Sequence, residues 1–268
     1  MGDTTLRGLK KVRMVTERIG HEILWVRKTE STNDLAWREA ERGCGDGMMV
    51  LAEEQTAGRG RQGRSWFCPP EQGILCSFVL RPGLPSDQAS LVTVCGALAV
   101  RDVAAALAGV PAVIRWPNDV MLSGRKVAGV LVESRTGTGT GETTFVLGIG
   151  LNVSVREEDF PETVRAEATS LERAAGRRID RLAAARVLIE SVDAWYLRLR
   201  GGRREEIADA WRAASAVLRR RVEVVAGGVA HRGTVEDIDP IEGIFLRPDR
   251  GGIQRYRGEL VERLRLLE

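Results

Sequence analysis

The residues between Gly58 and Arg64 have the composition of an anion-binding loop. Gly58-Arg59-Gly60-Arg61-Gln62-Gly63-Arg64 holds three arginines in six residues, interleaved with three glycines. Arginine offers a planar fork of donors for carboxylate and phosphate, and glycine lets backbone N–H groups approach an anion closely. Ordering so many glycines costs entropy, so we expect this loop to be mobile when empty and ordered over an anionic ligand. Taken alone, it fits a solvated arginine–glycine loop or a nucleic-acid contact equally well.

The same segment matches the dinucleotide-binding pattern G-x-G-x-x-G, but its context argues against that fold. The pattern must follow a strand and open a helix. Here it continues into Trp66 and the pair Pro69-Pro70, which exclude a helix. No acidic residue ends a second strand at the required distance, so we reject a dinucleotide site.

Three further segments each have an ordinary structural interpretation. Arg115-Trp116-Pro117-Asn118-Asp119 fits a strand end and a turn, and Gly124–Val130 fits a hairpin strand with a solvated lysine. Gly148-Ile149-Gly150-Leu151-Asn152 fits a strand with a close backbone approach. In isolation each structural interpretation is the better one, so only the combination of segments can indicate a function.

Five segments follow one another in a specific order. They are Ser31-Thr32-Asn33, Glu54–Trp66, Arg115–Asp119, Arg125–Glu133 and Gly148–Asn152. In this order and spacing they closely resemble the biotin protein ligases, which attach biotin to the carrier domain of biotin-dependent carboxylases. The resemblance runs from about Ile23 to the C-terminus. The Gly-Arg loop with its trailing Trp66 is highly specific, whereas the other segments are specific mainly by order and spacing.

The resemblance implies a role for individual residues. Biotin contacts are implied for Ser31, Thr32, Asn33, Gln55, Gly58, Arg59, Lys126 and Gly129. ATP or adenylate contacts are implied for Arg61, Arg64, Trp66, Asn118, Asp119, Lys126 and Asn152. Lys126 and Arg61 are the implied catalytic residues. The residue pattern alone leaves Trp66 open to a second interpretation as a core residue, because Phe67 follows it.

The implied chemistry agrees with the residues present. Biotin presents a carboxylate and ATP an α-phosphate, so clustered Arg and Lys are needed to bring two anions together. Mg²⁺ is expected mainly on the ATP phosphates, with no metal site in the protein. A carrier lysine then attacks the acyl-adenylate, so the enzyme needs no nucleophile of its own. The chain accordingly has only two histidines, no lipase-type elbow and no Cys–His pair.

Lysine is rare in this chain, which makes Lys126 distinctive. Of the 40 basic residues 36 are arginine, and Lys126 is the one lysine after residue 28. It falls where the family places its catalytic lysine. The family's usual Lys-Trp-Pro-Asn-Asp begins here with Arg115, which keeps the charge but replaces a compact ammonium with a planar guanidinium.

Two other functions compete with this one. A lipoate or octanoate transferase of the same fold would not be expected to carry the arginine loop followed by Trp66. A non-enzymatic nucleic-acid or regulatory module is the second alternative. The 22 residues before Ile23 are too few for a helix-turn-helix domain, so we expect the single-function form of the family, without DNA binding.

The elements that must position these residues indicate an α+β fold. Strands are predicted over residues 23–27, 48–53, 73–80, 113–116, 127–133 and 145–153. Helices are predicted from Ser31 to about 42, and over 86–108, 181–200 and 204–214. Ser31 with Asp34 fits a relaxed capping box. The resemblance implies a catalytic domain related to class II aminoacyl-tRNA synthetases, with a mixed sheet and flanking helices.

The pattern changes after about Val217. Short strands are predicted over 222–226, 233–238, 243–246 and 253–256, separated by Gly, Pro and Asp turns. Such evenly spaced strands suggest a small β-barrel, which the resemblance implies is SH3-like. We therefore expect an N-terminal extension over 1–22 without a core face, a catalytic domain over 23–217 and the barrel over 218–268.

Composition limits the remaining choices. The chain has 268 residues, 43% of them hydrophobic and 29% charged, which excludes disorder as its main state. A net charge of +3 does not indicate a nucleic-acid binder. The longest uncharged stretches have 13 residues, too few to span a bilayer.

Four cysteines without a CxxC pair predict reduced thiols in a cytoplasmic protein. The expected partners are biotin, ATP and a biotin carboxyl carrier protein domain, with no membrane; the sequence allows a homodimer.

Overall fold

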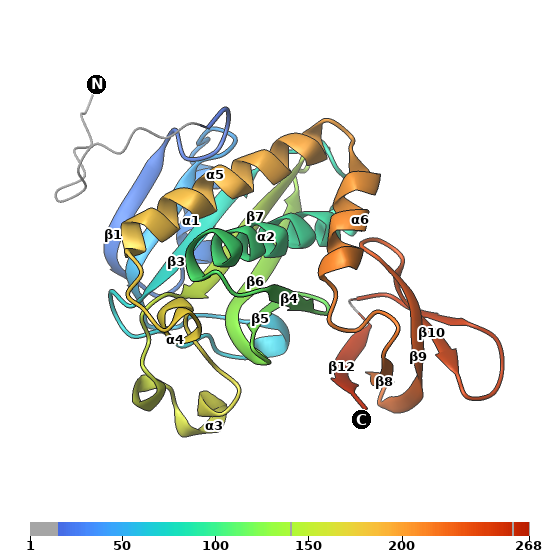
Figure 1. Ribbon diagram of the computed structural model, residues 1–268. Helices are drawn as coiled ribbons and strands as arrows, with labels where there is room; N and C mark the ends of the chain where they lie inside the picture. Colours follow the sequence, from blue (N-terminus) through green and yellow to red (C-terminus); the bar gives the residue numbers. More distant parts are fainter. Residues whose placement is uncertain (1–15, 140, 259, 268) are drawn as a thin grey trace.

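The computed structural model describes residues 16–139, 141–258 and 260–267, in which two β-sheets and several helices form (Figure 1). The larger sheet consists of β1 (Ile23–Thr29), β2 (Met49–Gln55), β3 (Gly73–Leu80), β4 (Ala112–Arg115), β5 (Asp119–Leu122), β6 (Arg125–Thr136) and β7 (Thr143–Asn152). Their order across the sheet is β1-β2-β3-β7-β6-β5-β4. β1 and β2 pair in parallel and the other neighbours antiparallel, so the sheet is mixed, as predicted.

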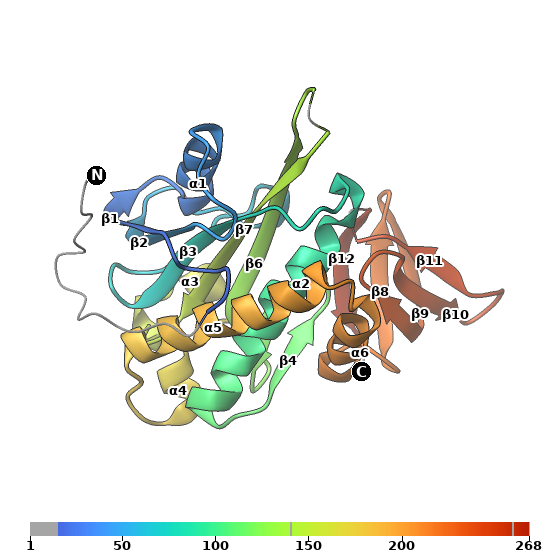
Figure 2. The same ribbon diagram turned by 90° about the horizontal axis from the view of Figure 1, so that it is seen from above.

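Helices cover both faces of this sheet (Figure 2). α1 (Thr32–Glu41) lies on one face, while α2 (Ala89–Val103) and α5 (Arg181–Arg200) lie on the other. α6 (Arg204–Ala214) packs against α2 and α5. Two short helices, α3 (Glu162–Arg165) and α4 (Leu171–Ala175), follow β7.

The alternation of side chains along β7 explains which face can hold a ligand. Phe145, Leu147, Ile149 and Leu151 are buried in the main core, which α2 and α5 share. The residues between them point to the face of α1, where Val146 packs in a small cluster with Ala36 and Trp37. The next two positions on that face are Gly148 and Gly150. They leave room above the sheet that larger side chains would fill.

The helix over residues 86–108 is the main core helix. Ser86–Ala108 is long and apolar enough to cross a membrane by length and composition, but 67% of its most apolar window is buried inside the protein. It packs against α5 and β6. Its apolar character is therefore explained by the core of the described fold.

The second sheet lies at the C-terminal end of the chain. Its strands are β8 (Arg221–Ala226), β9 (Val229–Asp239), β10 (Gly243–Pro248), β11 (Gln254–Tyr256) and β12 (Val261–Leu266). All of them pair antiparallel, in the order β11-β10-β9-β8-β12. The predicted run of short strands is confirmed, but β12 was not predicted. Arg and Leu alternate along β12, so its apolar pattern was too weak to predict a strand.

The helices over 181–200 and 204–214 and the strand over 73–80 have the predicted bounds. The capping box predicted at Ser31 is wrong, because Ser31 is the N-cap residue of α1 but its side chain accepts no backbone hydrogen bond. The reason lies in the neighbouring side chains. The Thr32 hydroxyl donates to Gln55, and Asn33 accepts from Ser77, so this end of α1 is joined to the sheet through its polar side chains.

The segment before β1 contributes to the core, contrary to the prediction for residues 1–22. Ile19 is fully buried in the main core. Buried Asp193 of α5 holds this segment, because its carboxylate accepts the backbone N–H groups of Glu17, Arg18 and Ile19 at 2.8–2.9 Å. The sequence pattern missed this contact because it joins residues more than 170 positions apart. Residues 1–15 lie outside the described residues.

Replacing Asp193 should destabilise the fold. Asp193→Ala leaves three backbone donors without their acceptor, so we expect the free energy of unfolding to fall by about 1–3 kcal/mol. Urea denaturation followed by circular dichroism measures the change. Glu190→Ala, on the same helix, is the control and should change the free energy by less than about 0.5 kcal/mol. Equal losses in the two variants would contradict the role given to Asp193.

Candidate active site

One cavity of about 820 Å³ opens on the face of the large sheet that carries α1. Its volume is that of a typical small-molecule site. It brings together thirteen of the residues assigned to biotin or ATP from the sequence: Ser31, Thr32, Asn33, Gln55, Arg59, Arg61, Arg64, Trp66, Asn118, Asp119, Lys126, Gly129 and Asn152. Gly58 does not line it. A side chain at Gly58 would come within 2.7 Å of the Trp66 carbonyl, so this glycine is needed for the loop to pass.

A β-bulge turns Lys126 toward the cavity. Val120 pairs with Ala128 and the next residue, Met121, pairs with Lys126, so Val127 is an extra residue in β6. An extra residue shifts the alternation of side chains by one position. Lys126 therefore lies on the same face of the sheet as Gly129. A Cβ atom added to Gly129 would lie 3.3 Å from the Lys126 Nζ. The Lys126 N–H donates to the Glu167 carbonyl, and the Thr169 N–H donates to the Lys126 carbonyl. These backbone hydrogen bonds hold this end of β6 in place.

The Asp119 carboxylate binds the side chains of both Lys126 and Arg115 at the centre of the cavity. Lys126 Nζ lies 2.6 Å from Asp119 Oδ1, and the Arg115 guanidinium lies 2.9 Å from Asp119 Oδ2. Burial would raise the pKa of Asp119, but the charge and hydrogen bonds of Lys126 and Arg115 outweigh it and hold the pKa below its ordinary value. Asp119 thus stays ionised and keeps both cations in place, with one net positive charge left for an anion.

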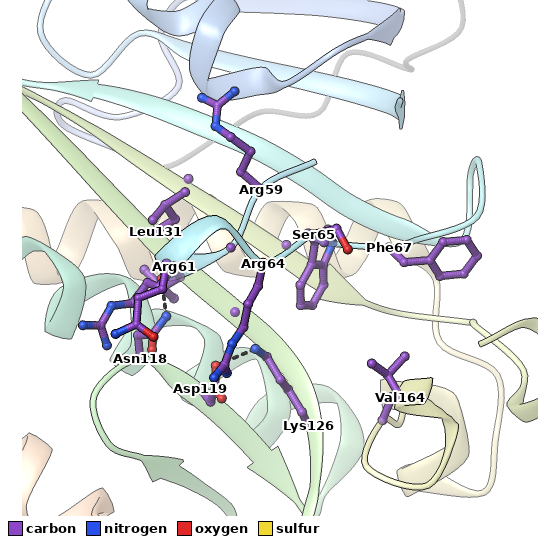
Figure 3. A pocket seen from close by; sticks show the side chains of 18 of the residues that line it. Arg59, Arg61, Arg64, Ser65, Phe67, Asn118, Asp119, Lys126, Leu131 and Val164 are labelled. Atoms are coloured by element: carbon purple, nitrogen blue, oxygen red, sulfur yellow. Dashed lines mark hydrogen bonds and ion pairs between the residues drawn. The ribbon is translucent and has the colours of Figure 1, made fainter. Parts of the chain in front are cut away.

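Arg64 adds a third cation on this side. Figure 3 shows its side chain pointing toward Asp119 and Lys126 from the loop above them. Asn118 lies beside the group and donates through its Nδ2 to the Val130 carbonyl at 2.7 Å. This bond ties the turn before β5 to β6.

Trp66 lies flat against two glycines of the sheet. Gly129 and Gly150 are paired across β6 and β7. A Cβ on Gly150 would lie 2.4 Å from the indole, and one on Gly129 would lie 3.2 Å from it. The Lys126 ammonium is 5.6 Å from the centre of the Trp66 ring, within cation–π range. The glycines are therefore required for Trp66 to reach this position.

The inner part of the cavity is buried and uncharged. Ser31, Thr32 and Asn33 are each 3–4% exposed. The Gln55 carbonyl oxygen accepts from both the backbone and the hydroxyl of Thr32, at 2.7 and 3.0 Å. These bonds orient the Gln55 side chain and leave its amide nitrogen as a donor. This end offers neutral hydrogen-bonding groups in place of charges.

Three polar atoms of residues in the cavity wall are buried and have no hydrogen-bond partner among the described residues. They are Asn33 Nδ2, Trp66 Nε1 and Asn152 Oδ1. Buried polar groups are normally paired, because an unpaired one costs free energy. All three belong to residues that line one cavity, although the atoms themselves are covered, so they become available to a bound molecule only when these side chains shift.

The Gly-Arg loop is more regular than the sequence suggests. Arg59 and Ser65 form a β-bridge, Gly60 donates to the Arg64 carbonyl at 2.6 Å, and residues Arg61–Gly63 form a single 3₁₀ turn. Gln62 has a φ of 55°, in the left-handed region. The loop is therefore a tight hairpin that lies over the cavity.

The side chain of Arg59 points away from Lys126. Its guanidinium binds the Asp34 carboxylate in a bidentate pair, with both distances 2.7 Å, and lies 3.2 Å from Glu133. The hydrogen bonds from Arg59 lower the pKa of Asp34 below its ordinary value. Figure 3 shows this direction, opposite to that of Arg64. Arg59 anchors the loop to α1 and β6, and the biotin contact that the resemblance implies for it stays a prediction.

The C-terminal part of the chain also binds the Gly-Arg loop. Arg61 donates to the Gly258 carbonyl at 2.9 Å, and Gln62 donates to the Val261 carbonyl at 3.1 Å. Arg263 and Arg265 of β12 line the cavity, as do Phe160 and Ala168 from the segment after β7. Neither segment was predicted to contribute a site residue. The alternating arginines of β12 were the available signal.

Comparison with known proteins agrees with this geometry. The family model "Biotin/lipoate A/B protein ligase family" matches residues 25–153. The biotin--[acetyl-CoA-carboxylase] ligase of Mycobacterium tuberculosis is 36% identical over 220 residues, which are 80% of this chain and 79% of that protein. The chain belongs to the biotin protein ligase family. Its resemblance to that family, predicted from the five segments, is thereby confirmed.

Two other comparisons define how far the likeness extends. The bifunctional ligase/repressor BirA of Bacillus spizizenii is 36% identical over 166 residues, and the chain spans about half the length of that relative. The solved biotin protein ligase of Aquifex aeolicus in complex with biotin and ATP has a TM-score of 0.78 and 25% identity. It covers 92% of this chain and 100% of its own. Both sheets therefore lie within the fold shared with a biotin protein ligase.

The Arg59–Asp34 pair generates a prediction about loop order. Asp34→Asn removes one charge of a pair that is more than a third exposed, so the effect should be modest. We expect proteinase K to cleave residues 56–65 about two- to fivefold faster in the unliganded variant. Mass spectrometry of the fragments measures the rate. Glu41→Gln, which removes the exposed pair with Arg135, is the control and should leave the rate unchanged. An unchanged rate in Asp34→Asn would show that Arg59 does not anchor the loop.

The ion pairs of Asp119 generate a prediction about pH. The folded pKa lies below the ordinary value of 3.8, so this carboxylate stabilises the fold above about pH 4 and loses that effect as the pH falls through the folded pKa. Asp119→Asn should lower the free energy of unfolding by about 1–3 kcal/mol at pH 7. The difference from the wild type should shrink toward pH 3. Urea titrations at pH 7, 4 and 2.5 measure it, and a difference independent of pH would contradict the assignment.

Proposed function

We propose that this protein forms biotinyl-5′-AMP from biotin and ATP and transfers biotin to a specific lysine of a biotin carboxyl carrier protein domain. One observation carries the proposal: a single cavity joins a buried, uncharged hydrogen-bonding end to a cationic centre at Lys126. Biotin has the same two halves, since its ureido ring is neutral and its valeryl chain ends in a carboxylate. Family membership supports the same activity.

The uncharged end suits the ureido ring. Ser31, Thr32 and Asn33 offer hydroxyl and amide groups in a buried setting, and Gln55 presents its amide. A urea group has both N–H donors and a carbonyl acceptor, so it can satisfy donors and acceptors together. In our proposal the Asn33 side chain shifts so that its Nδ2, which has no partner among the described residues, donates to that carbonyl. A charged ligand would find no counter-charge among these residues.

The cationic centre suits the reacting groups. The biotin carboxylate attacks the α-phosphorus of ATP, a new acyl-phosphate bond forms, and the bond to pyrophosphate breaks. In our proposal the Lys126 ammonium moves from Asp119 to a position between carboxylate and α-phosphate. Charge develops on the phosphoryl oxygens as the new bond forms, so a fixed ammonium stabilises the transition state more than the separate anions.

Arg61 and Arg64 are proposed to bind the phosphate side, with Asn118, Asp119, Asn152 and Trp66 around the nucleotide. Closing the Gly-Arg hairpin over the adenylate would exclude water, which matters because acyl-adenylates hydrolyse readily. The hydrogen bonds from this hairpin to Gly258 and to Val261 of β12 support a role for the C-terminal sheet in that closure. We propose that this sheet is an SH3-like domain beginning near residue 218.

Mg²⁺ would be carried by the ATP phosphates. Asp119 is the carboxylate beside Lys126, and both of its oxygens already bind cations. Among the described residues no group of three His, Cys, Asp or Glu side chains could hold a metal ion. We propose that Mg²⁺, which typically keeps several waters and binds through substrate phosphates and one or two carboxylates, would neutralise charge on the ATP phosphates.

The remaining parts of the proposal concern the setting of the reaction. The proposed acceptor is a lysine on a carrier domain: its neutral amine attacks the acyl carbonyl of the adenylate, an amide bond forms, the bond to AMP breaks, and the amine proton is lost to solvent. We place the reaction in the cytoplasm, where thiols stay reduced; the four unpaired cysteines support this. The reaction needs one copy of the chain, so a homodimer is no part of the proposal.

Lys126 provides the test. A guanidinium is too wide to sit between two anions as a point charge, so Lys126→Arg should fail almost as completely as Lys126→Ala. We expect biotin-dependent ATP–pyrophosphate exchange to fall about 10²–10³-fold in both variants, with the fold intact. Lys28→Ala, which removes an exposed pair with Glu54, is the control and should keep full activity.

The same assay separates the competing functions. Exchange should depend on biotin and should not be supported by lipoate, octanoate or added DNA. If Lys126→Arg keeps the wild-type rate, Lys126 is only a general positive charge and the mechanism fails. If exchange depends on lipoate, the substrate assignment fails.

A further inference from the structure

The Gly-Arg hairpin is held from two sides. On one side Arg59 binds carboxylates of α1 and β6. On the other, Arg61 donates to the Gly258 carbonyl at 2.9 Å and Gln62 donates to the Val261 carbonyl at 3.1 Å. The position of the Arg61 guanidinium therefore depends on where the Gly258 carbonyl is held.

The turn between β9 and β10, residues 239–243, supports the backbone just before Gly258. Gly243 has a φ of 92°, and a Cβ there would lie 2.1 Å from the Tyr256 carbonyl oxygen and 2.7 Å from the Arg257 Cα. The turn thus packs directly against the two residues that precede Gly258. A shift of this turn would move the carbonyl that Arg61 binds.

Arg212 of α6 holds the same turn from the side of the large sheet. Its Nε donates to Asp237 Oδ1 at 3.0 Å and to the Ile238 carbonyl at 3.1 Å, and its Nη2 lies 3.8 Å from Asp239 Oδ2. Asp239 in turn accepts two backbone N–H groups of the turn, both at 2.8 Å. One planar guanidinium therefore contacts three consecutive residues at the end of β9, which a single ammonium could not do.

The junction around this contact is hollow. A second cavity of about 220 Å³ lies between α2, α6 and the C-terminal sheet, and its lining includes Arg61, Trp116, Trp211, Asp239 and Gly258. α6 lies next to β9 (Figure 1). Across a cavity the two walls make no packing contacts with each other. The polar contacts of Arg212 therefore contribute more to the placement of the turn than they would in a filled interface.

We propose that Arg212 is a positioning residue for Arg61. This inference rests on the proposed function, in which Arg61 binds the phosphate side of the nucleotide. Arg212 is not among the residues that line the main cavity, so it acts through the turn and the Gly258 carbonyl. Without the Arg212 contacts the turn is less constrained, and the Arg61 guanidinium loses its fixed place over the cavity. The inner, uncharged end of the cavity is built by α1 and β2 and does not depend on this turn.

A comparison of the two substrates tests the proposal. In biotin-dependent ATP–pyrophosphate exchange, Arg212→Ala should raise the KM for ATP about five- to tenfold, because a displaced Arg61 loses part of a charge-assisted hydrogen bond to phosphate. The KM for biotin should stay within about twofold of the wild type, which also reports an intact fold. Arg212→Lys keeps the charge without the planar fork and should raise the KM for ATP about two- to threefold.

The matched control is Arg219→Ala. Its exposed ion pair with Glu236 lies in the same C-terminal part of the chain and makes no contact with α6. Both KM values should stay within about twofold of the wild type in this variant.

A double variant tests whether Arg212 acts through Arg61. Residues that act through one contact are not additive. Adding Arg212→Ala to Arg61→Ala should therefore change the KM for ATP by less than about twofold, compared with five- to tenfold when Arg61 is present.

Three results would overturn the inference. Equal rises in the KM for ATP and for biotin would show that Arg212 only stabilises the fold. A full five- to tenfold effect in the Arg61→Ala background would show that it acts by another route. An effect of Arg219→Ala as large as that of Arg212→Ala would show that any loosening of the C-terminal sheet is sufficient. Absence of biotin-dependent exchange in the wild type would instead refute the proposed function, so the two failures are distinguishable.

Discussion

The site depends on one half-buried carboxylate, that of Asp119, which is held between two cations. Asp119 binds Lys126 at 2.6 Å and Arg115 at 2.9 Å, and it stays ionised because these partners outweigh the cost of its burial. Without it, the like charges of Lys126 and Arg115 would repel each other. With it, the cavity holds a compact cationic centre before any substrate binds. In the proposed reaction two anions must meet, and such preorganised charge lowers the barrier because the protein need not reorganise during the reaction.

Backbone geometry in the sheet sets where that centre lies. The extra residue at Val127 turns Lys126 to the open face, and the pair Gly129–Gly150 makes room for Trp66 beside it. Gly148 does the same for Asn33, because a Cβ there would lie 2.3 Å from the amide oxygen. Each of these is a place where the regular strand pattern is broken. The breaks coincide with the cavity, as expected where function outweighs local regularity.

Much of this could be predicted from the sequence. The five segments and their order indicated the family, and thirteen of the assigned residues line one cavity. Individual contacts could not be predicted, since they depend on distant partners. The alternation of β6 suggested no bulge, because Val127 looks like any other strand residue. The direction of Arg59 depends on Asp34 and Glu133, which lie 25 and 74 positions away. β12 was missed because its apolar pattern is weak, although it closes the cavity and bonds to the Gly-Arg hairpin.

The central claim is that this cavity joins the biotin carboxylate to the α-phosphate of ATP. Isotope transfer tests it most directly. Biotin labelled with ¹⁸O in its carboxyl group is incubated with ATP, the protein and an unbiotinylated carrier domain, and the products are analysed by mass spectrometry. Attack on the α-phosphorus predicts one ¹⁸O atom in each AMP released and none in pyrophosphate. Label in inorganic phosphate with ADP as the nucleotide product would show attack at the terminal phosphate, and it would contradict the account.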